Sequence, residues 1–171
     1  MLPKKLFVLL VFTLIKLSAS AQALCIVDGL LTPDSILYVT SDEMRSEDAP
    51  AIIGNRINGI SKYAIKSISV IDKDSVLNKN TVFCYGIQRD IVIIRTNSLA
   101  LFDWVVDGKQ VLPRRPLNVI EYKISPHLLH KSLPKGINEK NIKDVNIVFR
   151  NGEVRPEARS TIYISTRKKK H

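Results

Sequence analysis

The sequence Val27-Asp28-Gly29 decides the fold of this chain, because it returns 79 positions later as Val106-Asp107-Gly108. A longer stretch returns with it, since IKSISVI at residues 65–71 is matched by IKDVNIV at residues 142–148. The order of the matched stretches is kept, while the loops between them lose residues. This pattern indicates a duplicated structural unit before it indicates any chemistry.

Each copy is expected to contain a hairpin, a helical turn and two further strands. Asp-Gly favours a two-residue hairpin turn, because both residues tolerate positive φ. Residues 61–65 and 138–142 each begin with a residue that can cap a helix, and the stretches that follow alternate between apolar and polar residues. Residues 91–94 are continuously apolar, which is typical of a central strand, whereas residues 162–166 have the polar neighbours expected at a sheet edge.

Other segments lie between the repeated stretches. Residues 36–40 and 117–124 are each expected to add a strand, and residues 73–79 and 126–132 are expected to be helical. Together the elements predict an α+β fold made of two β-α-β repeats with mixed sheet and short helices.

The chain divides into four parts. Residues 1–23 are predicted to be a secretory signal peptide, because two lysines precede an apolar run that ends in small residues. An uncleaved amphipathic anchor is the alternative. Residues 24–98 and 99–166 are the two repeats, and residues 167–171 are a basic tail. The mature protein is therefore expected to cross the inner membrane and to be periplasmic or associated with the outer membrane.

The charge of the chain does not predict a nucleic-acid partner. The net charge is +10, but several of the basic residues belong to the signal peptide and the tail. The remaining charges alternate in sign along the sequence, which is typical of a solvated surface. Two readings of the basic tail stay open: contact with anionic lipid, or a solvated end.

Cys25 and Cys84 are the only cysteines, and an oxidising compartment would allow them to form a disulfide. The alternative is that Cys84 is a small buried apolar residue. Trp104 lies in an apolar stretch before the second Asp-Gly and is expected to anchor the core.

No catalytic or metal-binding motif is found in the sequence. His127 and His130 have the spacing of one helical face but lack further ligands at the spacing of a zinc site. Asp28 and Asp107 are expected to serve the turns and not to act as a catalytic pair. The sequence therefore predicts no enzyme activity, no cofactor and no metal.

The first copy resembles the plug domain of TonB-dependent outer-membrane receptors, particularly the starch-utilisation type. The residues that carry the resemblance are Val27, Asp28 and Gly29, the stretch 65–70, Tyr85 and Gly86, and the strand 91–96. The second copy, with Val106, Asp107 and Gly108, resembles a more diverged plug. The glycines that the family has before its last strand are missing from both copies, and so is the transmembrane barrel.

The resemblance implies a stand-alone, duplicated plug-like protein without transport activity. We expect a non-enzymatic protein-interaction module associated with outer-membrane uptake systems, with envelope or outer-membrane proteins as partners. A periplasmic carbohydrate or small-ligand binding protein is the first alternative, and an enzyme or enzyme inhibitor is the second.

Overall fold

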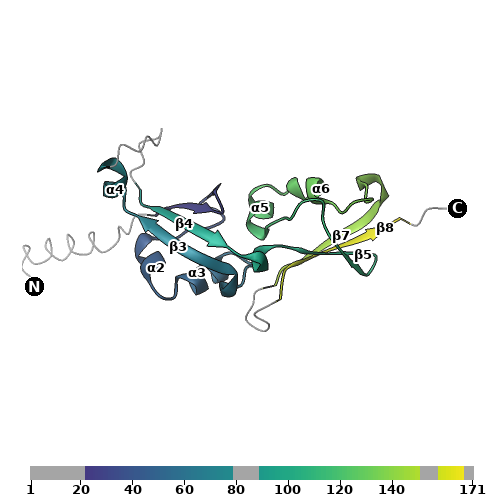
Figure 1. The fold of residues 1–171 in the computed structure, drawn as a ribbon, viewed down its shortest axis with the longest axis horizontal. Helices are drawn as coiled ribbons and strands as arrows, with labels where there is room; N and C mark the ends of the chain where they lie inside the picture. The colour runs from purple at the N-terminus through teal and green to yellow at the C-terminus, as the bar shows by residue number, and fades with distance from the viewer. Residues whose placement is uncertain (1–21, 79–88, 151–157, 168–171) are drawn as a thin grey trace, which may run out of the picture.

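The computed structural model describes residues 22–78, 89–150 and 158–167, and it contains two four-stranded mixed sheets that lie end to end (Figure 1). The strands of the first sheet are β1 (Leu24–Val27), β2 (Leu30–Thr32), β3 (Ile65–Ile71) and β4 (Ile91–Thr96). Those of the second sheet are β5 (Asp103–Val106), β6 (Lys109–Val111), β7 (Ile142–Val148) and β8 (Thr161–Thr166). The strand orders are β2-β1-β4-β3 and β6-β5-β8-β7, so every strand has a counterpart in the other sheet.

The pairing of the strands is also duplicated. In each sheet the Asp-Gly hairpin pairs antiparallel, and its first strand pairs parallel with the closing strand. The β3 register shifts between Ile65 and Ser67, and the β7 register shifts between Ile142 and Asp144, the same place in the second copy. The repeats and the α+β class predicted from the sequence are therefore confirmed.

Short helices connect the strands. They are α2 (Ser41–Arg45), α3 (Ala49–Arg56), η1 (Lys62–Ala64), α4 (Lys73–Asn78), η2 (Ser98–Ala100), α5 (Val119–Ile124), α6 (Leu128–Ser132) and η3 (Glu139–Asn141). Thr40 caps α2 and Asn118 caps α5, each within a capping box completed by a glutamate three residues later. In the view of Figure 1, α2 and α3 lie below the first sheet and α5 and α6 lie above the second.

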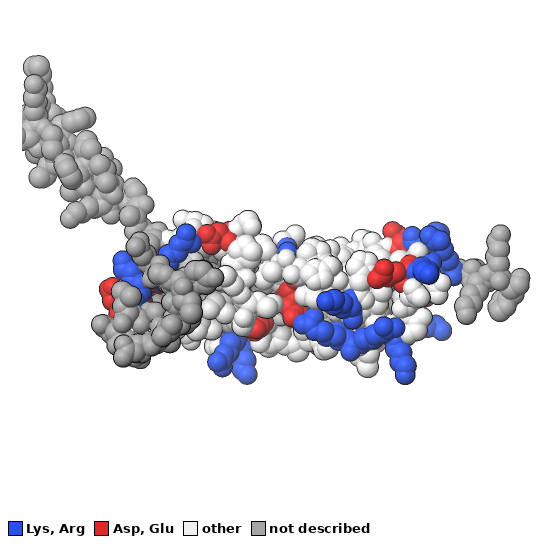
Figure 2. Space-filling view, turned by 90° about the horizontal axis from the view of Figure 1, so that it is seen from above, with Lys and Arg blue, Asp and Glu red and all other residues white. Residues whose placement is uncertain are grey.

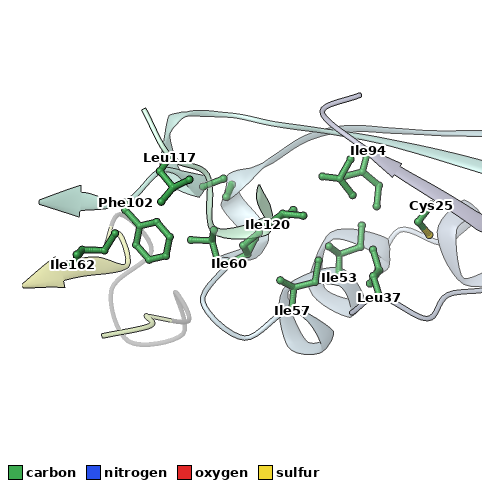
Figure 3. Packing of buried hydrophobic residues seen from close by; sticks show 14 of the residues in the cluster. Cys25, Leu37, Ile53, Ile57, Ile60, Ile94, Phe102, Leu117, Ile120 and Ile162 are labelled. Carbon is green, nitrogen blue, oxygen red and sulfur yellow. The ribbon is translucent and has the colours of Figure 1, made fainter. Parts of the chain in front are cut away.

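One hydrophobic cluster runs through both copies. Val27 and Ile94 contribute to it from the first sheet, and Trp104 and Ile162 contribute from the second. Where the copies meet, Ile60 lies near Phe102, Leu117 and Ile120 (Figure 3). The two repeats therefore share an interior and are not separate domains on a linker.

Three expectations about individual elements are wrong. Residues 117–124 form no strand and contain helix α5, because Asn118 and Glu121 make a capping box that starts a helix at Val119. Residues 36–40 form no strand, and an isolated bridge between Gln22 and Thr40 is the β-pairing they make among the described residues.

The closing strand of the second copy is the third. β8 lies between β5 and β7 and is not at the edge of its sheet. Its polar residues alternate with Ile162 and Ile164, which are buried, because one face of the sheet is exposed. The alternation of polar and apolar residues along β8 therefore reflects an exposed face of the sheet and not a position at its edge.

Several predictions lie outside the described residues. These are nearly all of the signal peptide at residues 1–23, the partner cysteine Cys84, the Tyr85-Gly86 pair and most of the basic tail. None of the helices within residues 22–78, 89–150 and 158–167 is both long and apolar enough to span a bilayer.

Candidate functional site

The two Asp-Gly turns have the same internal geometry. Asp28 and Asp107 adopt φ values of 49° and 47°, in the left-handed region that an Asp tolerates better than most residues. The Asp28 carboxylate accepts a hydrogen bond of 2.8 Å from the Thr96 backbone N–H and another from the Thr96 hydroxyl. Asp107 accepts the equivalent bonds of 2.8 and 2.6 Å from Thr166.

These hydrogen bonds explain what the aspartates do. The Thr166 hydroxyl and backbone N–H hold the pKa of Asp107 below its usual range, because they stabilise the carboxylate form. Each carboxylate therefore fastens a hairpin turn to the end of the closing strand. Thr96 and Thr166 each end the closing strand of their copy, and the motifs alone do not identify them as the partners of the aspartates.

Asn118 joins the first turn to the second copy. Its side-chain amide lies 3.2 Å from the Asp28 carboxylate and 3.1 Å from the Thr96 hydroxyl. Its carbonyl oxygen also caps α5 by accepting from the Ile120 N–H. Nothing in the spacing of the sequence indicates this contact, because it depends on how the repeats pack.

His127 and His130 do not converge on a metal site. His127 is the N-cap residue of α6, and the exposed His130 lies 3.2 Å from a carboxylate oxygen of Glu139. Within the part of the chain that the structure describes, no group of three metal-ligating side chains is brought together.

Cys25 and Trp104 occupy equivalent positions on β1 and β5, and both are buried in the interior, as the sequence predicts for Trp104. Burial, with a smaller contribution from Asp34, raises the pKa of the Cys25 thiol to about 11. A thiol with that pKa is a poor nucleophile near neutral pH. Its pairing with Cys84 stays a prediction.

The strands β3 and β7 form the long edges of the two sheets. Each is seven residues long, and within the described residues each pairs on one side alone, with β4 and with β8 respectively. The exposed side chains at two equivalent positions differ: Ser67 and Ser69 on β3 correspond to Asp144 and Asn146 on β7. Charged residues on an edge discourage the addition of another strand, so β7 is the better protected edge.

The outer faces of the sheets, opposite the shared interior, also differ. The register places Leu24, Ile26, Leu31 and Ile93 on the outer face of the first sheet, where Leu31 is 59% exposed. The equivalent residues of the second sheet are Asp103, Val105, Gln110 and Tyr163. At these four positions the outer face of the first sheet is therefore apolar, whereas that of its copy is mixed and more polar.

Basic residues are concentrated in the second copy. Residues 99–171 contain 15 lysines and arginines against 7 acidic residues, whereas residues 22–98 contain 8 against 9. Figure 2 shows a large group of basic side chains over the second copy. The charges are therefore less evenly spread than their alternation along the sequence suggests.

No protein-family model, curated protein or solved structure matches the chain.

Proposed function

We propose that the protein is a non-enzymatic interaction module of the cell envelope, in which β3 pairs with an extended segment of another envelope protein. The observation that carries this proposal is the position of β3, an edge strand with small polar residues that borders an apolar outer face. Addition of a strand to a sheet edge is a common way for proteins to bind extended segments.

The chemistry of β3 suits such a partner. Unpaired N–H and C=O groups along a seven-residue edge supply backbone hydrogen bonds without selecting a sequence. Ser67 and Ser69 are exposed and small, so they leave room for the side chains of an incoming strand. The nearby outer-face residues Ile71 and Ile93 offer apolar contacts that would give the pairing its selectivity.

The resemblance to receptor plugs supports the proposal without testing it. The order of a Val-Asp-Gly hairpin, a short turn, an alternating strand and a closing strand is common to the motif pattern and to each copy of this fold. An envelope location rests on the signal-peptide pattern of residues 1–23. The absence of enzyme activity is proposed because the two aspartates considered as a pair are used in separate turns.

Photo-crosslinking tests the proposal at a single position. A photoreactive amino acid is placed at Ser69 of the full chain, in the cells that naturally make the protein. The matched control places it at Asn146, the equivalent exposed position on β7. We expect discrete adducts with envelope proteins from position 69 and none from position 146.

A charge variant tests whether the edge itself is used. Ser67→Asp gives β3 the residue that β7 has at Asp144, and it is expected to abolish the adducts while the circular dichroism spectrum stays unchanged. Equal adducts from the two positions would contradict the proposal, as would adducts that persist in the Ser67→Asp chain.

A further inference from the structure

A cavity of about 480 Å³ opens beside the hairpin of the second copy. Its apolar walls include Phe102, Trp104, Val111 and Pro116, and its polar lining residues are Asp103, Gln110 and Arg159. The volume falls in the range of small-molecule sites, and an apolar wall with a few polar groups is their usual composition.

Two opposite charges lie together in the lining of this cavity. A guanidinium nitrogen of Arg159 lies 3.3 Å from a carboxylate oxygen of Asp103. Each side chain is about one third exposed, at 36% and 33%, so solvent and solutes can reach both groups. Arg159 has five N–H donors and the carboxylate accepts several hydrogen bonds, so both groups keep capacity for a ligand.

Trp104 adds a third feature. Its indole N–H is buried and has no hydrogen-bond partner among the described residues. Trp104 is also the only tryptophan in the chain, so its fluorescence is a single-site probe in the wall of this cavity.

The first copy arranges the corresponding residues differently. Arg89 is equivalent to Arg159, but it pairs with Asp34, which stands at the position of Pro113 in the second copy. Leu24 replaces Asp103 and Cys25 replaces Trp104. The Arg–Asp pair of the first copy therefore joins different positions, and Arg89 supplies an internal control.

We propose that this cavity binds a free apolar α-amino acid as its zwitterion. The carboxylate of the ligand would bind Arg159, its ammonium would bind Asp103, and its side chain would pack on the apolar walls. A ligand that carries both charges matches an Arg–Asp pair better than an anion or a cation, because neither protein charge is left without a partner.

The fluorescence of Trp104 provides the test. The full chain is titrated with L-leucine, which does not absorb where tryptophan is excited, and thermal unfolding is measured at each concentration. We expect a saturable change in emission and a rising melting temperature. N-acetyl-leucine lacks the ammonium group, leucine amide lacks the carboxylate, and both are expected to bind about tenfold more weakly or worse.

Variants locate the binding site. Arg159→Gln and Asp103→Asn are each expected to weaken leucine binding by about tenfold or more, whereas Arg89→Gln in the first copy leaves it unchanged. The proposal is overturned if leucine changes neither the emission nor the melting temperature, or if maltose or N-acetyl-leucine binds as well as leucine. These outcomes are independent of crosslinking at β3.

Discussion

At the scale of single residues, the fold depends on two aspartates that fasten two hairpins. Asp28 and Asp107 are predictable from the sequence as turn residues, because Asp-Gly suits positive φ. Their attachment to Thr96 and Thr166 is not predictable from either motif alone, since 68 and 59 positions separate the partners. Asn118 makes the first turn different, because its amide adds a hydrogen bond from the other copy.

Replacing the two aspartates separates these contributions. Asp28→Ala is expected to lower the free energy of unfolding by about 2–4 kcal/mol, because it removes bonds to a carboxylate and leaves alanine at positive φ. Asp107→Ala suffers the same backbone strain but loses no contact with the other copy, so it is expected to cost less. Urea denaturation measures both changes. Equal losses would show that the Asn118 contact adds no stability.

Glu43 links stability to pH. Hydrogen bonds from Arg56, and then from the Thr40 N–H, lower the pKa of Glu43 from 4.5 to about 2. Since the folded-state pKa is depressed, the stabilisation is fully present above about pH 4.5 and is lost as the pH falls through about 2.

The measurement is urea denaturation of the wild type and of Glu43→Gln across that range. The wild type is expected to be more stable at neutral pH, and the difference is expected to shrink as the pH approaches 2. The difference between the wild-type and Glu43→Gln unfolding free energies at each pH cancels the contribution of the other carboxylates, which both chains share. A difference that does not vary with pH would mean that the Arg56–Glu43 pair has no part in acid stability.

At the scale of elements, local patterns predicted most strands and missed what tertiary packing decides. The hairpins, the helical turns and the central position of β4 follow from turn chemistry, capping and continuous apolar sequence. The expected strand at residues 117–124 is a helix instead, and Asn118 and Glu121 carry the capping signal for it in the sequence itself. The position of β8 depends on its neighbours, which no local pattern specifies.

The loops before η1 and η3 provide a matched pair of glycines. Gly59 and Gly136 have φ values of 98° and 89°. A Cβ at Gly59 would lie 2.5 Å from the Phe149 ring, whereas one at Gly136 would meet nothing within 4 Å. Gly136→Ala is therefore expected to cost about 1–2 kcal/mol from backbone strain. Gly59→Ala is expected to cost about 1–3 kcal/mol more, because Phe149 must move.

Chemical denaturation of the two alanine variants checks this difference. Similar losses in both would mean that Phe149 does not pack against Gly59 in solution. Phe149→Leu in the Gly59→Ala background is expected to recover part of the loss, since the smaller side chain relieves the contact.

At the scale of the whole molecule, the two copies share a fold but have different surface features. The first offers an open edge and an apolar outer face, and the second carries the positive charge and the cavity. The repeat could be predicted from the sequence. The β3 edge and the outer face beside it could not be predicted, because strand order defines which strand lies at an edge and which face points outward. The cavity could not be predicted either, because its lining residues come from distant parts of the second copy.

The central claim is that two copies of one module fold around a single interior, and one substitution tests it most directly. Ile53→Ala removes a fully buried side chain from α3 in the first copy, with an expected loss of about 3 kcal/mol. Unfolding is followed by Trp104 fluorescence, which reports on the second copy, and by circular dichroism, which reports on both. We predict one transition that moves to lower denaturant equally for both probes. A Trp104 transition that stays at its wild-type position would contradict the shared interior.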